Sequence, residues 1–290
     1  MEIVVFGAAG QLGRSIMDIS YNYPKHHFLF TDVENVDITK PHQVANFVSR
    51  NYPKVIINCA AYTAVDRAQN DPKAAMELNI HAVSSLAKIA AENNIFLVHV
   101  STDYIFDGKQ NRPYRETDNV HPLSVYGRTK WKGEVEVMRS LCRAAIIRTS
   151  WLYSEYGTNF VKTILGLSAE KEQLSVVADQ IGTPTYARDL AEVIMQIINE
   201  KQKIEKTETF NYSNEGVASW YDFAVEILRL SKRKCKVLPV SSTQYSTPAK
   251  RPQYSVLSKQ KIRETFDIEI PHWRDSLERC LANMDKSKKK

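Results

Sequence analysis

The first 150 residues alternate regularly between strand-like and helix-like segments. The strand-like segments are short and almost continuously apolar, at residues 2–6, 27–30, 54–58, 95–100 and 143–148. Helix-like segments lie between them, starting near Gln11 and Pro41, covering 72–92, and including Tyr126. Strands that are apolar on both faces belong to parallel sheets covered by helices. The alternation therefore predicts an α/β fold with a Rossmann-type, doubly wound parallel sheet.

The alternation weakens after about residue 150. We expect shorter strands at 174–177 and 209–212, helices near 185–199 and 219–232, and a loop rich in Pro, Ser and Thr over 239–255. This pattern predicts a smaller C-terminal domain at 151–285 that is interleaved with a first domain at 1–150. A basic tail is expected at 286–290.

The stretch VVFGAAGQLG places Gly7, Gly10 and Gly13 directly after the first strand and at the start of a helix. Glycines allow a tight turn and a close approach of the backbone to a pyrophosphate, and a helix N-terminus offers free N–H groups. Asp32 follows the second strand, about 20 positions after Gly13, where dinucleotide-binding chains have an acid that binds the ribose. The sequence therefore predicts a dinucleotide site in the first domain, and the alternative role of Asp32 is to cap a turn.

The type of dinucleotide stays open. A ribose bound by Asp32 would disfavour a 2′-phosphate. Asp37 offers a second carboxylate near the adenine, and Arg14 follows the glycines closely enough to reach a 2′-phosphate. Both NADH and NADPH remain candidates.

SVYGRTK places Tyr126 and Lys130 four residues apart on one predicted helix. Such pairs are common on helix surfaces, so the spacing alone does not define a catalytic site. The polar stretches 58–66 and 100–108 follow two strands, and the carboxyl ends of parallel strands meet at one edge of a sheet, beside the glycines. At that edge Tyr126 could donate a proton to a carbonyl oxygen.

A lysine ammonium next to a phenol lowers the pKa of the phenol from its usual value of about 10. We therefore expect Lys130 to lower the pKa of Tyr126, and Ser101 or Thr102 to hold the substrate oxygen.

The glycine motif, STDYIFDG, YxxxK and RTSW together resemble the extended short-chain dehydrogenase/reductase family. NCAAYTAVDRA, GTNFVKTIL, DQIGTPT and TPAKRPQYSVL resemble the dTDP-4-dehydrorhamnose reductases within that family, from Met1 to about Trp273. The resemblance implies reduction of the C4 keto group of dTDP-6-deoxy-L-lyxo-4-hexulose (dTDP-4-dehydrorhamnose) to give dTDP-L-rhamnose. It also implies NADPH or NADH as the cofactor, held by the first domain, and a second domain that mainly binds the nucleotide sugar.

Matching positions imply a role for individual residues. Thr102, Tyr126 and Lys130 would be catalytic, and Asp103 would tune them. The residues implied for the cofactor are Gly7, Gly10, Gln11, Leu12, Gly13, Asp32, Asp37, Ile38, Ala60, Ala61, Tyr62, Tyr126 and Lys130. Those implied for the nucleotide sugar are Thr102, Trp151, Asn159, Lys162, Gln180 and Arg251. A core position for Trp151 and a surface position for Arg251 are the alternatives.

Some members of this family hold a magnesium ion between subunits with glutamates near the first helix and after GxPT. The corresponding residues in this chain are Ser15 and Arg188, so that Asp189 is the one acid left. An arginine repels a cation, so we expect no metal site and a monomer or a weak homodimer.

Composition and charge narrow the possible partners. The chain of 290 residues has a net charge of +6, much of it in the tail, and carries no nucleic-acid-binding motif. No apolar run reaches the roughly 20 residues of a membrane span, and Met1 leads directly into a strand without a signal sequence. The four cysteines form no CxxC pair, which favours reduced thiols. A cytoplasmic protein without nucleic-acid or membrane partners is expected.

Two other classes of protein remain as alternatives. One is a non-catalytic regulatory protein that resembles the methionine adenosyltransferase regulatory subunit, and the other is a nucleotide-sugar epimerase or dehydratase. The intact Thr102, Tyr126 and Lys130 favour catalysis over the first, and DQIGTPT and TPAKRP favour net reduction over the second.

Overall fold

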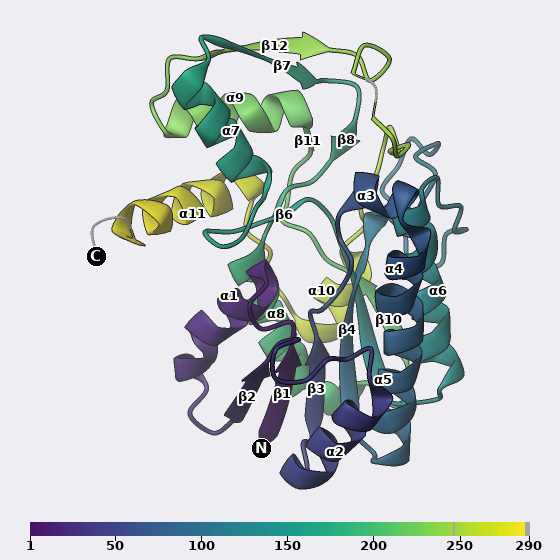
Figure 1. Ribbon diagram of the computed structural model, residues 1–290. Coiled ribbons are helices and arrows are strands. Elements are labelled where there is room, and N and C mark those ends of the chain that lie inside the picture. Colours follow the sequence, from purple (N-terminus) through teal and green to yellow (C-terminus); the bar gives the residue numbers. More distant parts are fainter. Residues whose placement is uncertain (246, 288–290) are drawn as a thin grey trace.

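A parallel sheet of six strands forms the centre of the computed structural model, which describes residues 1–245 and 247–287 (Figure 1). The strands, in the order β10-β5-β4-β3-β1-β2, are β1 (Glu2–Phe6), β2 (His27–Thr31), β3 (Val55–Asn58), β4 (Phe96–Thr102), β5 (Ala144–Thr149) and β10 (Glu208–Asn211). From β1 the chain moves outward to β2 and then returns to β3 on the opposite side of β1. Ligands of doubly wound sheets bind at such a reversal of strand order. The predicted Rossmann-type fold is confirmed.

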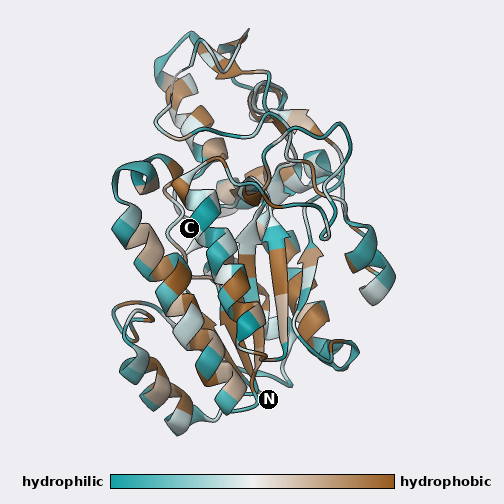
Figure 2. Ribbon diagram, turned by 90° about the vertical axis from the view of Figure 1, so that its right-hand side faces the viewer, coloured by the Kyte–Doolittle hydropathy of each residue, from teal (hydrophilic) through white to brown (hydrophobic). Residues whose placement is uncertain are grey.

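Helices cover both faces of this main sheet. One face carries α1 (Gln11–Ile19), α8 (Ala187–Asn199) and α10 (Gln260–Phe266), and the other carries α2 (Pro41–Asn51), α5 (Ala82–Glu92) and α6 (Val125–Arg139). Successive strand side chains point to opposite faces. Accordingly, Ile3 and Val5 of β1 join the first core, and Val4 and Phe6 join the second. Figure 2 shows these apolar strands in brown behind helices with many hydrophilic positions.

A smaller lobe lies beyond the carboxyl ends of the main strands (Figure 1). It contains α7 (Phe160–Glu170), α9 (Trp220–Leu230) and α11 (Trp273–Ser287), packed around Phe223 and Trp273. Three pairs of short strands complete it: β7 (Gln173–Val177) with β12 (Lys236–Val240), β6 (Leu152–Tyr153) with β9 (Thr185–Tyr186), and β8 (Ile181–Gly182) with β11 (Ala218–Ser219).

The second half of the chain also contributes to the main sheet. The strand expected at 209–212 is β10, which pairs with β5 at the edge of that sheet, and α8 packs against α1. The expected loop over 239–255 begins within β12. The predicted tail at 286–290 overlaps the end of α11, and 288–290 lie outside the described residues.

The segment 72–92 is one continuous helical stretch but not one α-helix. α4 (Pro72–Met76) and α5 are joined by a π-helical turn, η2 (Glu77–His81), and a further short helix, α3 (Val65–Asn70), precedes them. The wide turn positions the buried Asn79, which accepts a hydrogen bond from the Tyr62 N–H (2.9 Å) and donates to the Tyr62 carbonyl and the Thr129 hydroxyl (both 3.1 Å). These bonds fasten the loop after β3 to α6.

The four cysteines are free thiols, as expected. Among the helices of the described residues, none combines the length and apolar character that a bilayer span requires.

Candidate active site

A cavity of about 980 Å³ opens at the carboxyl ends of β1, β3, β4 and β5. Its lining comes from the glycine motif at 7–13 (the glycine turn), from the segment after β3, from the end of β4, from α6 and from the base of the smaller lobe. Small-molecule sites commonly measure about 300–1,000 Å³, so this cavity has room for an extended ligand.

The glycine turn fits a dinucleotide pyrophosphate. Gly7 has a left-handed φ of +75°, and a Cβ there would lie 2.6 Å from the backbone nitrogen of Ala60. At Gly13 a Cβ would lie 2.4 Å from the Gly7 carbonyl oxygen, which explains the close packing of α1 on the turn. α1 starts without a side-chain cap, so its first N–H groups can bind an anion.

Asp32 lies at the end of β2 and lines the cavity. Its carboxylate accepts hydrogen bonds from the N–H groups of Ala9 and Val33, both at 2.8 Å, so it supports the glycine turn. Carboxylate oxygens accept more than one hydrogen bond each, so a role at a ribose is compatible with these contacts. Asp37 also lines the cavity, and its carboxylate accepts from the hydroxyl of Thr39 at 2.7 Å.

Arg14 is not among the cavity-lining residues of the described chain. Its side chain is exposed, and its guanidinium carbon lies 5.5 Å from the ring centre of Tyr156.

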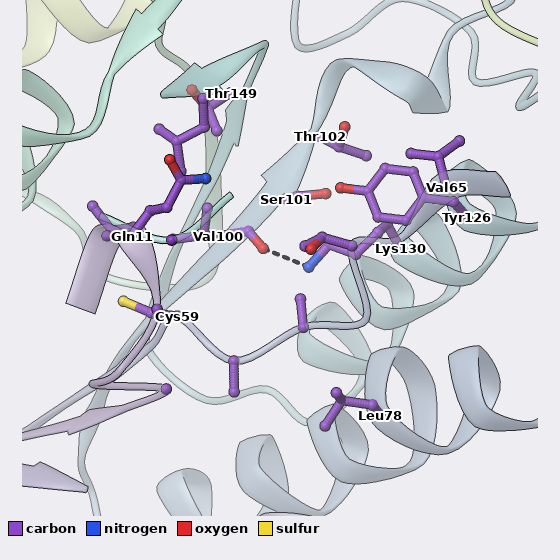
Figure 3. A pocket seen from close by; sticks show the side chains of 18 of the residues that line it. Gln11, Cys59, Val65, Leu78, Val100, Ser101, Thr102, Tyr126, Lys130 and Thr149 are labelled. Atoms are coloured by element: carbon purple, nitrogen blue, oxygen red, sulfur yellow. Dashed lines mark hydrogen bonds between the residues drawn. The ribbon is translucent and has the colours of Figure 1, made fainter. Parts of the chain in front are cut away.

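Tyr126 and Lys130 extend from α6 toward the end of β4 (Figure 3). The hydroxyl oxygen of Ser124 caps α6 by accepting from the Gly127 N–H at 3.1 Å, so the helix starts just before Tyr126. The Lys130 ammonium donates to the Val100 carbonyl at 2.6 Å. Both side chains line the cavity together with Thr102.

The pKa of Tyr126 differs from the expectation. Burial raises this pKa, the hydrogen bond with Thr102 opposes the shift, and Asp103 adds to it, so that the pKa of Tyr126 lies at about 12. In the unliganded protein Lys130 is not among the groups that shift the pKa of Tyr126, and its ammonium is bonded to the Val100 carbonyl instead. Burial in turn lowers the pKa of Lys130 to about 8, against an opposing effect of Glu134. Tyr126 is thus a protonated phenol at neutral pH, which is the form that can donate a proton.

The two candidate hydroxyls of β4 have different partners. Ser101 donates its hydroxyl proton to the buried carboxylate of Glu134 at 2.5 Å. Thr102 donates to Asp103 at 3.1 Å and accepts from the Tyr104 N–H at 3.2 Å. Burial raises the pKa of Asp103 to about 7, opposed by hydrogen bonds with Ser255 and Thr102. Thr102 is the better candidate for binding a substrate oxygen, because it is bonded to Tyr126 and its bond to Asp103 is longer than the bond from Ser101 to Glu134.

Trp151 and Asn159 line the cavity from the smaller lobe. The Trp151 ring stacks on Trp220, with 3.6 Å between ring centres, so it forms a wall of the cavity. Asn159 caps α7 and donates from its amide nitrogen to Gln11 at 2.9 Å. This bond connects the glycine turn to the smaller lobe.

Five of the predicted site residues are not among the cavity-lining residues of the described chain, namely Gly13, Tyr62, Lys162, Gln180 and Arg251. Gly13 packs against Gly7 and Ala8, and the backbone of Tyr62 is bonded to Asn79. Lys162 is exposed, and its ammonium donates to the Glu155 carbonyl at 3.2 Å. Arg251 forms a two-pronged ion pair with Asp66, at 2.7 and 3.1 Å.

Other lining residues had not been anticipated individually: Cys59, Thr63, Val65, Leu78, Tyr104, Thr149, Ser150, Gly157 and Trp220. Cys59, Thr63 and Val65 belong to the polar stretch after β3, so their location at the end of a strand was a usable signal. Leu78 on the π-helical turn and Trp220 at the start of α9 line the cavity because of tertiary packing, which no sequence motif indicates.

Ser15, Arg188 and Asp189, which correspond to the magnesium-binding positions of some family members, interact with other residues. Ser15 is buried and donates to the Gln11 carbonyl at 2.9 Å, and Arg188 lies 3.7 Å from Glu192. The Asp189 carboxylate accepts from Asn214, Ser276 and Arg279 at 2.5 to 2.7 Å. Over residues 1–245 and 247–287, no group of three or more His, Cys, Asp or Glu is arranged to hold a metal ion.

We expect EDTA to change neither the catalytic rate nor the oligomeric state, because the Asp189 carboxylate is already fully engaged. Light scattering and steady-state rates before and after an excess of EDTA, and again after magnesium is added back, would measure both. A magnesium-dependent change between dimer and monomer would contradict this expectation.

The parallel sheet, the glycine turn at its reversal point and the Tyr126–Lys130 pair define a dinucleotide-binding protein of the short-chain dehydrogenase/reductase class. Within this class, the chain belongs to the family described as RmlD substrate binding domain, which matches residues 1–286.

Named relatives agree with this assignment. The dTDP-4-dehydrorhamnose reductase of Aggregatibacter actinomycetemcomitans is 39% identical, over 97% of this chain and 98% of that protein. The crystal structure of a dTDP-4-dehydrorhamnose reductase from Clostridium acetobutylicum has a TM-score of 0.93 and 41% identity, covering 98% of this chain and 100% of that one. That of the Bacillus anthracis reductase in complex with NADP has a TM-score of 0.93 and 37% identity, covering 97% and 99%.

Proposed function

We propose that the protein reduces the C4 keto group of dTDP-6-deoxy-L-lyxo-4-hexulose (dTDP-4-dehydrorhamnose) with NADPH or NADH and so forms dTDP-L-rhamnose. The observation that carries this proposal is that Thr102, Tyr126 and Lys130 line the same cavity as the glycine turn. The names of the relatives support the choice of nucleotide sugar.

In the proposed reaction, the bound nicotinamide supplies a hydride to the carbonyl carbon. Tyr126 donates its phenol proton to the carbonyl oxygen, and burial keeps that proton in place at neutral pH. Thr102 would hold the same oxygen by a hydrogen bond once its hydroxyl proton turns from the Asp103 carboxylate to the substrate. We assign to charged Lys130 the stabilisation of the phenolate that forms once substrate and cofactor are bound, because the described lining of the cavity contains no other lysine or arginine.

The cavity also supports a division of binding roles. We assign dinucleotide binding to 1–150, where the glycine turn, Asp32, Asp37, Ile38, Ala60 and Ala61 line one arm of the cavity. We assign nucleotide-sugar binding mainly to 151–285, with Trp151 and Asn159 as the lining residues that contact the sugar nucleotide. Arg251, Lys162 and Gln180 would contact it only after rearrangement, because they lie outside the lining.

The test is a steady-state assay of the purified chain with dTDP-4-dehydrorhamnose and reduced cofactor, with the product identified by NMR. Consumption of one reduced cofactor per dTDP-L-rhamnose formed would support the proposal. Rearrangement of the sugar without net cofactor consumption would indicate an epimerase. Cofactor binding without any turnover would indicate the regulatory class.

We expect NADH to support reduction at a rate comparable with NADPH. A carboxylate at Asp32 disfavours a 2′-phosphate, and among the described lining residues Lys130 is the sole lysine or arginine. The measurement is kcat/KM with each cofactor, with Asp32→Asn as the matched variant that should shift preference toward NADPH. An NADH value below one hundredth of the NADPH value, about 2.7 kcal/mol at about 1.36 kcal/mol per decade, would show that the assignment of Asp32 to the ribose is wrong.

A further inference from the structure

A buried charge cluster lies directly behind Lys130 and has no part in the reaction described above. It consists of Ser101 on β4, Glu134 on α6 and Arg148 on β5, whose exposed fractions are 3%, 0% and 2%. The Glu134 carboxylate accepts from the Arg148 guanidinium at 2.8 to 3.1 Å and from the Ser101 hydroxyl at 2.5 Å. Every carboxylate oxygen of Glu134 is therefore bonded within the cluster.

The cluster continues the catalytic face of α6. Tyr126, Lys130 and Glu134 are spaced four residues apart and so lie on one side of the helix, above one another. Lys130 donates to the carbonyl of Val100, and Glu134 accepts from the hydroxyl of Ser101, the next residue of β4. The two side chains thus hold consecutive positions of the strand that ends in Thr102.

Lys130 has few groups around it that stabilise a positive charge. The thiol of Cys59, directly after β3, and the imidazole of His99 on β4 interact with it. Burial keeps both neutral by raising the pKa of Cys59 to about 12 and lowering that of His99. Tyr126 is a neutral phenol, as described above. Glu134 is the carboxylate that raises the pKa of Lys130 against the effect of burial.

Arg148 moderates the charge of Glu134 and has further contacts of its own. One guanidinium nitrogen donates to the Glu116 carbonyl at 3.1 Å, and the group lies 5.5 Å from the ring centre of Phe106. Buried ion pairs contribute little net stability, because desolvation offsets most of the attraction between the charges. Stability alone therefore does not account for this buried ion pair.

We propose that Glu134 is a positioning residue for the reduction: its carboxylate keeps Lys130 charged inside the buried site and fixes Ser101, and Arg148 limits the negative charge that Lys130 experiences. This inference rests on the proposed function, in which the ammonium of Lys130 stabilises the phenolate of Tyr126.

The sign of the expected pH effect follows from the charges. Activity requires charged Lys130, so it is lost as the pH rises through the pKa of that residue. Glu134→Gln removes a nearby negative charge, which lowers the pKa of Lys130. In a plot of kcat against pH, the decline on the alkaline side (the alkaline limb) should therefore move to lower pH by about one unit. Arg148→Met removes a positive charge and should move the limb to higher pH. A purely structural role would lower the thermal stability in both variants without opposite shifts of the limb.

Two further variants complete the experiment. Glu134→Gln combined with Arg148→Met leaves no unpaired buried charge, and its alkaline limb should lie between those of the wild type and Glu134→Gln. Glu136→Gln is the matched control on the same helix, since Glu136 binds Ser84 and Arg139 away from Lys130. Its profile should equal that of the wild type.

A second measurement separates this inference from the proposed function. NMR of the unliganded protein labelled at the ε-carbon of lysine, assigned with Lys130→Met, gives the pKa of Lys130 without any assay of activity. A lower pKa in Glu134→Gln and a higher one in Arg148→Met would support the inference even if the nucleotide sugar were not reduced. An unchanged pKa in both variants would overturn it.

Discussion

Replacing Tyr126 with Phe should lower kcat by about 10² to 10⁴-fold while the fold and the affinity for the cofactor stay nearly unchanged. The substitution removes only the phenol oxygen, and the ring keeps its edge-on contact with Tyr104, with 5.9 Å between ring centres. Without the phenol, the carbonyl oxygen would have to take its proton from water. Single-turnover kinetics, cofactor titration and thermal unfolding would measure the three properties separately.

A matched control for this variant is Tyr212→Phe. Tyr212 is fully buried, and within the described residues its hydroxyl has no hydrogen-bond partner. Removing that oxygen should leave kcat unchanged. If Tyr126→Phe kept more than about half of the normal kcat while chemistry limits the rate, far outside the range for lost acid catalysis, Tyr126 would be only a structural helix residue.

Replacing Lys130 with Met should lower kcat by about 10²-fold or more without lowering the melting temperature. Lys130 is only 2% exposed, and a buried charge is costly, so an apolar side chain of similar length suits the same space. Steady-state kinetics and thermal unfolding at neutral pH give both quantities.

Combined with Tyr126→Phe, this change should add little further loss, since the two residues act as one proton-delivery unit. A double variant whose loss equals the product of the two single losses would mean that Lys130 acts independently of Tyr126.

The alternation of apolar strands and helices was sufficient to predict most of the main sheet, because β1, β3, β4 and β5 are buried on both faces and each turn signal is local. The position of β10 was not predictable in this way. Its sequence at 208–211 resembles any short strand, and its place beside β5 depends on the path of the chain through the smaller lobe. The π-helical turn at Glu77–His81 was not predictable either, since the hydrogen bond that its Asn79 accepts comes from a loop residue 17 positions away in the sequence.

Sequence motifs predicted the cavity residues at the strand ends better than those contributed by the smaller lobe. Gly7 and Asp32 follow strands, Thr102 ends β4, and Tyr126 lies at the start of α6. All four lie at one edge of the sheet, so topology alone brings them together. Trp220, by contrast, joins the site by stacking on Trp151, which no sequence pattern indicates. The direction of the Lys130 ammonium was also not predictable from the sequence. The spacing of Tyr126 and Lys130 on a helix does not indicate that the ammonium donates to the Val100 carbonyl.

The π-helical turn at Glu77–His81 also constrains how this chain can change in length. A helix rotates by about 100° per residue, so the extra residue offsets α4 from α5 by that angle. The offset lets Asn79 hold Tyr62 while Val83 and Leu86 of α5 still face the sheet. Deleting one residue here could preserve one of these alignments but not both. In descendants of this sequence, insertions and deletions should therefore spare 77–81, even where the individual side chains diverge.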